Sequence, residues 1–79
     1  MSGTLEERVR AIITDVASEP ISDGDRLRED LDCAEVDLND IVIDLEAAFV
    51  IMLPDDIEDA WTTVEDVIAA VRAAVEEAS

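Results

Sequence analysis

Apolar side chains that recur every three or four residues constrain the fold of this chain more than any other feature. The most regular stretch follows residue 34, where the acids lie mostly off the apolar stripe. The stripe consists of Leu38, Ile41, Val42, Leu45, Ala48 and Phe49. This spacing predicts an amphipathic helix that begins at Glu35 or at Asp37 and ends near Val50.

Residues 4–17 and 63–77 show the same spacing and predict two more long helices. Each is preceded by a capping-box pattern, in which two side chains satisfy backbone amides that the helix leaves unpaired. The pairs with this spacing are Thr4 with Glu7 and Thr62 with Glu65. The chain is therefore expected to hold three long helices, with the middle one at residues 35–50.

A short third helix is expected before residue 62, because Pro54 suits a first helical position and Asp55 and Asp56 suit a first turn. It has room for about two turns, at about 3.6 residues per turn. No stretch shows the alternation of a strand. The prediction is an all-α, four-helix bundle of three long helices and a short third one, in a single domain of residues 1–79.

Residues 18–32 form an unusually long connection that contains Pro20 and Gly24. Leu27 and Leu31, four residues apart, are expected to turn inward. A connection of this length is above the usual range. It suggests that the helices on either side are roughly parallel, so that the loop travels the length of the bundle.

The chain is extremely acidic, with 22 Asp and Glu, five Arg, no Lys and a formal net charge of −17. Such a chain repels nucleic acid and anionic membranes, and basic protein surfaces are its expected partners. There is no apolar run of about 20 residues and no signal-peptide pattern, so a soluble, cytoplasmic monomer is expected.

The sequence lacks the residue patterns that catalytic and metal sites usually need. The chain contains no His, which excludes Ser-His-Asp and Cys-His catalysis, and the residues around Asp30 lack the EF-hand ligand spacing. No enzymatic activity and no metal site are expected. Acidic neighbours raise a thiol pKa, so Cys33 is interpreted as a partly buried small apolar residue.

The segment from Glu29 to Phe49, EDLDCAEVDLNDIVIDLEAAF, resembles the core of an acyl carrier protein, which reads EDLGADSLD followed by an acidic-apolar helix ending in LEEEF. The register continues through Leu53-Pro54-Asp55, similar to the family's Ile-Pro-Asp, and through Thr62-Thr63-Val64, similar to its Thr-Thr-Val. The resemblance covers nearly the whole chain and implies the carrier-protein type of helical bundle.

The resemblance also marks what this chain lacks. Glu35 stands where the family has the serine that carries 4′-phosphopantetheine, and no residue from Asp32 to Leu38 is Ser or Thr. No cofactor is therefore expected. Family members hold an acyl chain between their helices. The residues expected to fill that cavity here are Trp61, Glu58 and Leu45.

The family binds basic enzyme surfaces through acids and exposed apolar side chains. The matching positions here are Val36, Asp37, Asp40, Ile43, Glu46, Ala47, Asp56 and Asp59. Three functions remain open: a docking, scaffold or regulatory protein for carrier-recognising biosynthetic enzymes; a working carrier in fatty-acid or polyketide biosynthesis; or an unrelated acidic adaptor or nucleic-acid mimic. It also stays open whether residues 50–53 are core or contact surface.

Overall fold

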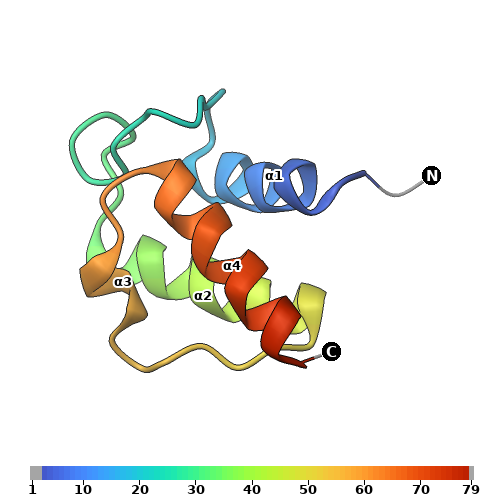
Figure 1. Cartoon of the computed structure of the whole chain (residues 1–79). Helices are drawn as coiled ribbons and strands as arrows, with labels where there is room; N and C mark the ends of the chain where they lie inside the picture. The colour runs from blue at the N-terminus through green and yellow to red at the C-terminus, as the bar shows by residue number, and fades with distance from the viewer. Residues whose placement is uncertain (1–2, 79) are drawn as a thin grey trace.

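The computed structural model describes residues 3–78 and contains four helices in that range (Figure 1). They are α1 (Leu5–Ala17), α2 (Glu35–Phe49), α3 (Ile57–Ala60) and α4 (Val64–Ala78). No strand is assigned in these residues, although Arg26 and Thr63 form an isolated antiparallel bridge. The prediction of an all-α chain with three long helices and a short third one is confirmed.

The helix starts follow the predicted capping chemistry, with one shift. The hydroxyl of Thr4 accepts the Glu7 N–H at 3.2 Å, and the Glu7 carboxylate accepts the Thr4 N–H at 3.5 Å. At α4 the predicted pair of Thr62 and Glu65 is wrong, because the box lies one residue later. The Thr63 hydroxyl accepts the Asp66 N–H at 3.3 Å, and Asp66 accepts the N–H groups of Thr62 and Thr63.

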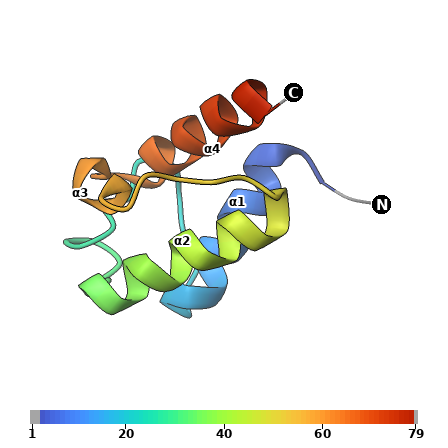
Figure 2. The same ribbon diagram turned by 90° about the horizontal axis from the view of Figure 1, so that it is seen from below.

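The third helix is shorter than predicted. The Ile57 N–H donates to the Pro54 carbonyl at 3.1 Å, so residues 54–57 form a turn, and Asp56 lies outside helical geometry with φ −107° and ψ 20°. At the other end, Trp61 is extended and buries its indole in the core. The turn and this anchor leave a single helical turn, which lies beside the N-terminal half of α2 (Figures 1 and 2).

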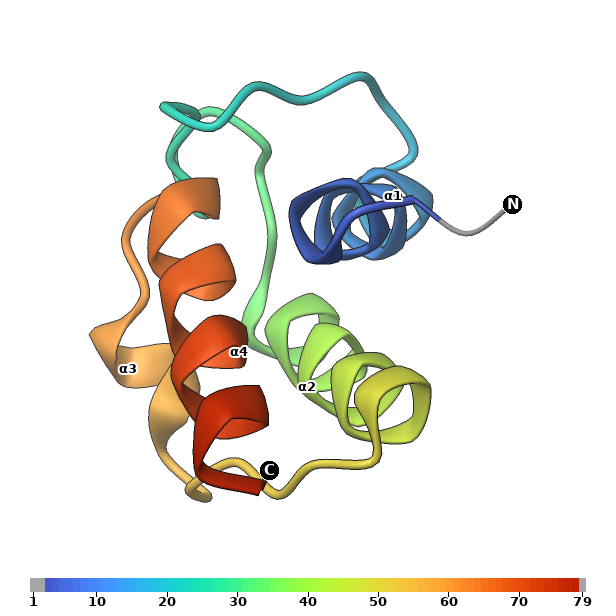
Figure 3. The same cartoon turned by 45° about the vertical axis from the view of Figure 1, so that its right-hand side comes forward.

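The connection at residues 18–34 does not run along the bundle, and the prediction of parallel flanking helices is wrong. Helices α1 and α2 run in opposite directions (Figure 3), and Arg8 near the start of α1 donates to the Ala48 carbonyl near the end of α2 at 3.0 Å. The connection covers the start of α4 instead. The N–H groups of Val64 and Glu65 each donate at 3.0 Å to carbonyls of that connection. Its length therefore serves to cap α4.

A single cluster of buried apolar side chains joins the elements. Its members are Val9, Ile13, Leu27, Leu31, Cys33, Leu38, Ile41, Val42, Leu45, Ile51, Leu53, Trp61, Val64, Val67, Ile68 and Val71. Leu27 and Leu31 turn inward as predicted. Val50 ends α2 in a left-handed conformation, with φ 54° and ψ 53°. Burial then alternates along residues 50–53: Ile51 and Leu53 are buried, while Val50 and Met52 are 86% and 92% exposed.

Candidate functional site

The N-terminus of α2 holds the position at which the resemblance implies the attachment serine. Glu35 is the first residue of the helix, and it is exposed. The Asp37 carboxylate accepts the Ala34 N–H at 3.0 Å, which satisfies one backbone amide at this end. A carboxylate at Glu35 is favoured by the helix dipole. It has no hydroxyl that could form a phosphodiester, so the residue does not fit 4′-phosphopantetheine.

One face of α2 carries four exposed residues in a line. Val36, Asp40, Ile43 and Ala47 are separated by four, three and four residues, and we call this line the outer stripe. Val36 is 64% exposed and Ile43 is 53% exposed. The buried side chains of α2, from Leu38 to Leu45, point to the opposite side and into the core. The outer stripe is therefore an apolar and acidic face that is not part of the core.

The other predicted docking acids differ from one another. Glu46 accepts the Leu53 N–H at 2.9 Å, so its carboxylate holds the segment after α2 in place. Asp37 caps the start of α2, as described above. Asp56 and Asp59 are exposed at and beside α3. The fold therefore gives two of these carboxylates a structural contact and leaves Asp56 and Asp59 open to solvent.

Among residues 3–78, none of the five arginines forms an ion pair with these predicted docking acids. Arg10 forms a bidentate pair with Asp23 at 2.6 and 2.8 Å, and these hydrogen bonds lower the pKa of that carboxyl group. Arg28 donates to the carbonyls of Trp61 and Glu58. The remaining contacts are Arg26 with Glu29 and Asp30, Arg72 with Glu6, and Arg8 with the Ala48 carbonyl and the Phe49 ring.

This distribution leaves the surface acids of α2 without internal cations. Among residues 3–78, no ion pair involves Glu35, Asp40 or Asp44. Closely spaced carboxylates with no neighbouring cation produce a negative potential that extends into solvent. A basic partner is the natural complement of such a surface.

The residues predicted to fill an acyl cavity are placed as follows. Leu45 is fully buried and Trp61 is 2% exposed, and both belong to the core cluster. Glu58 is only half-buried, and its backbone carbonyl accepts from Arg28 at 3.3 Å. The indole Nε1 of Trp61 is buried and has no hydrogen-bond partner in the described part of the chain.

Cys33 is 5% exposed, which makes it more buried than the sequence suggested. Burial, together with the nearby Asp37, raises the pKa of its thiol. Residues 3–78 contain no group of three or more His, Cys, Asp or Glu side chains placed to hold a metal ion. Within that range, no helix is long and apolar enough to cross a membrane.

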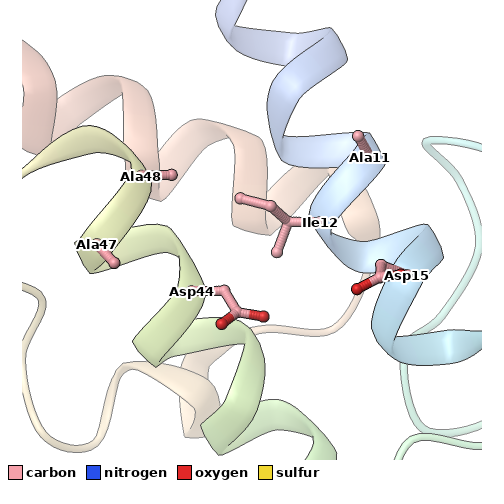
Figure 4. Close-up of a pocket in the computed structure, with 6 residues that line it drawn as sticks. All are labelled: Ala11, Ile12, Asp15, Asp44, Ala47 and Ala48. Carbon is pink, nitrogen blue, oxygen red and sulfur yellow. The ribbon is translucent and has the colours of Figure 1, made fainter.

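Sequence reasoning missed an open groove between α1 and α2. It is lined by Ala11, Ile12 and Asp15 on one side and by Asp44, Ala47 and Ala48 on the other (Figure 4). The sequence does show small alanines at residues 11, 47 and 48, but nothing in it pairs the two helices. Alanines leave room between helices that larger residues would fill.

No protein-family model matches this chain, and no curated protein matches it. The resemblance to acyl carrier proteins therefore rests on the motifs of the chain itself, and it stays a prediction.

Proposed function

We propose that this chain is an acyl-carrier-protein homologue without the attachment serine, and that it acts as a non-catalytic docking, scaffold or regulatory protein for carrier-recognising biosynthetic enzymes. The observation that carries the proposal is the outer stripe of α2, an apolar face beside unpaired acids that begins directly after Glu35.

The stripe has the two properties that a docking face needs. Val36 and Ile43 are more than half exposed, so a partner that covers them removes apolar surface from water. The neighbouring Asp40 has no ion pair among residues 3–78, so a basic partner gains its attraction without first breaking an internal contact. Such charges accelerate association and determine its salt dependence more than they add affinity.

The start of the same helix offers no residue that could carry the phosphopantetheine arm. Glu35 offers a carboxylate where a carrier needs a hydroxyl, and its neighbours from Asp32 to Leu38 offer none either. Trp61 and Leu45 are both buried in one cluster, which supports a core filled by side chains. A protein that binds carrier-recognising enzymes but carries no acyl group would have both the outer stripe and these residues.

The test is a loading assay with a broad-specificity phosphopantetheinyl transferase and coenzyme A, read by mass spectrometry of the intact protein. The wild-type chain is expected to keep its mass. The Glu35→Ser variant is expected to gain the mass of one phosphopantetheine arm, because the transferase would recognise the same outer stripe. The Glu35→Gln variant is the matched control, since it changes the charge and supplies no hydroxyl.

Each outcome bears on the proposal. Loading of the wild-type chain would refute it and favour a working carrier with an unexpected attachment residue. Failure of the Glu35→Ser variant to load, while its helical circular-dichroism spectrum matches that of wild type, would remove the carrier-protein assignment and favour an unrelated acidic adaptor. Loading of Glu35→Ser alone supports the proposal.

A further inference from the structure

The groove between α1 and α2 is a second surface that the outer stripe does not explain. It offers about 600 Å³ of space that is open to solvent, and alanine methyl groups and the Ile12 side chain form its apolar walls (Figure 4). Ala11, Ala47 and Ala48 are exposed, so the groove opens to solvent. A space of this volume is large enough for one or two long side chains.

Two carboxylates, one from each helix, lie at the groove. The carboxylates of Asp15 and Asp44 extend from α1 and α2 into the space between the helices (Figure 4). No hydrogen bond or ion pair joins either carboxylate to another residue in the 3–78 range. One helical turn before Ala11 and Ile12, Arg8 lies 4.4 Å from the centre of the Phe49 ring and donates to the Ala48 carbonyl. Arg8, the cation next to the groove, is therefore already bound to the Ala48 carbonyl and the Phe49 ring, whereas Asp15 and Asp44 have no such partner in the 3–78 range.

No contact within residues 3–78 compensates the charge of these two acids. They add like charges that face the same space in a chain of net charge −17. Asp15 also lies in the last turn of α1, where the helix dipole disfavours a carboxylate. A variant with neutral side chains at both positions is expected to be at least as stable as wild type. A bound cationic group would reverse this unfavourable interaction.

We propose that this groove receives an arginine side chain from a basic amphipathic helix of a protein partner. The stem of the arginine would lie over Ile12 and the alanines, and the guanidinium would lie between Asp15 and Asp44. Long cationic side chains pack their apolar stems on apolar surface while the charge stays at the rim. A guanidinium can also donate to two carboxylates at once. The proposal rests on the proposed docking role, but its surface shares only Ala47 with the outer stripe.

The probe is a synthetic alanine-based helical peptide with three arginines spaced four residues apart, titrated into ¹⁵N-labelled protein at 0.15 M NaCl. At this salt concentration the screening length is about 8 Å, so distant charges contribute little. A copy of the peptide with citrulline in place of arginine keeps the shape and removes the charge. Amide shifts are expected to concentrate at residues 11–15 and 44–48, and the citrulline copy is expected to bind at least tenfold more weakly.

Two variants of the protein test the groove itself. The double variant Asp15→Asn/Asp44→Asn should bind the arginine peptide about tenfold more weakly and should melt no lower than wild type. Ala11→Leu keeps all the charges and fills the groove, so it should also weaken binding. The matched control is Glu76→Gln/Glu77→Gln, which makes the same change in net charge on exposed residues of α4 and should change affinity less than twofold.

The proposal is overturned if both double variants weaken binding equally, since general negative charge would then explain the affinity. It is also overturned if the Asp15/Asp44 variant melts lower than wild type, because the two acids would then have a structural role. Shifts confined to Val36, Asp40 and Ile43 would refute the groove and leave the outer stripe intact. Equal shifts at the groove with 10 mM magnesium chloride would indicate a simple cation site.

Discussion

Removal of the Ile43 side chain from the outer stripe separates docking from folding. Ile43 is 53% exposed and lies on the face opposite the buried side chains of α2. If the Glu35→Ser variant is loaded as proposed, the phosphopantetheinyl transferase serves as a partner whose recognition can be measured. The change Ile43→Ala is expected to weaken recognition by that enzyme while the free protein stays folded.

The magnitude follows from the exposed surface. Ile43→Ala removes three carbon atoms, each worth about 0.8 kcal/mol when transferred out of water. About half of that surface is still in water in the free protein, so a partner that covers it gains about 1.2 kcal/mol there. This corresponds to a loss of about eightfold in kcat/KM. Alanine is the better helix former, by a few tenths of a kcal/mol, which offsets the small loss of packing in the free protein.

The assay is steady-state loading with coenzyme A, with unfolding in urea followed by the fluorescence of Trp61, the single tryptophan. The loss should appear in KM with kcat nearly unchanged, because the contact is made equally in the ground state and the transition state. Met52→Ala is the control: Met52 is 92% exposed, yet it lies beyond the C-terminal end of α2, about 20 Å or more along the helix from residue 35. If Met52→Ala lowers kcat/KM as much as Ile43→Ala does, or if Ile43→Ala changes it less than twofold, the stripe is not the recognition surface.

Four further predictions concern stability. Asp66→Ala should lower the free energy of unfolding by about 1 kcal/mol at neutral pH, since Asp66 caps α4. Hydrogen bonds from the Thr63 and Thr62 N–H groups lower the pKa of Asp66. Its contribution is therefore complete above the unfolded pKa of about 4 and is lost as the pH falls through the lower folded value, so urea titrations of variant and wild type should converge in acid. Leu45→Ala should cost about 2–5 kcal/mol, because Leu45 is fully buried, and should leave much of the chain unfolded by circular dichroism. Trp61→Phe should stay within about 1 kcal/mol of wild type, because the smaller ring also removes a buried N–H that has no partner in residues 3–78. Raising NaCl from 0.01 to 0.5 M should raise the melting temperature. The reason is that salt screens the repulsion within a chain of charge −17 over distances comparable to its 11.4 Å radius of gyration. A constant or falling melting temperature would contradict this account.

Local signals in the sequence were sufficient for the long helices. The stripe from Leu38 to Phe49 and the Thr4–Glu7 box act within a few residues, so spacing alone locates them. The errors arose where distant segments meet. The Glu65 N–H donates to the Asp23 carbonyl, a contact across 42 positions of sequence that no local pattern contains. It helps to define the start of α4, and it explains the length of the connection at residues 18–34.

The two candidate surfaces differ in the same respect: one could be predicted from the sequence and the other could not. The outer stripe follows from the period of one helix, so Val36, Asp40, Ile43 and Ala47 could be selected from sequence. The groove requires the pairing of α1 with α2, and the loop was expected to make these helices parallel. In the antiparallel arrangement Asp15 lies near Asp44, and Arg8 lies near Ala48. Only the tertiary structure brings these groups together.

The placement of the arginines bears on why the chain is so acidic. Solubility depends on net charge and would be served by any arrangement of the same residues. Here Arg10, Arg26 and Arg28 all bind at or beside the connection that caps α4, through Asp23, Asp30 and the carbonyls around α3. Arg72 of α4 binds Glu6 in the first turn of α1, and Arg8 of α1 binds the Ala48 carbonyl near the end of α2. The cations therefore contact the irregular segments and other helices, and among residues 3–78 none of them forms an ion pair with Glu35, Asp40 or Asp44. The proposed docking role accounts for this placement, whereas solubility alone does not require it.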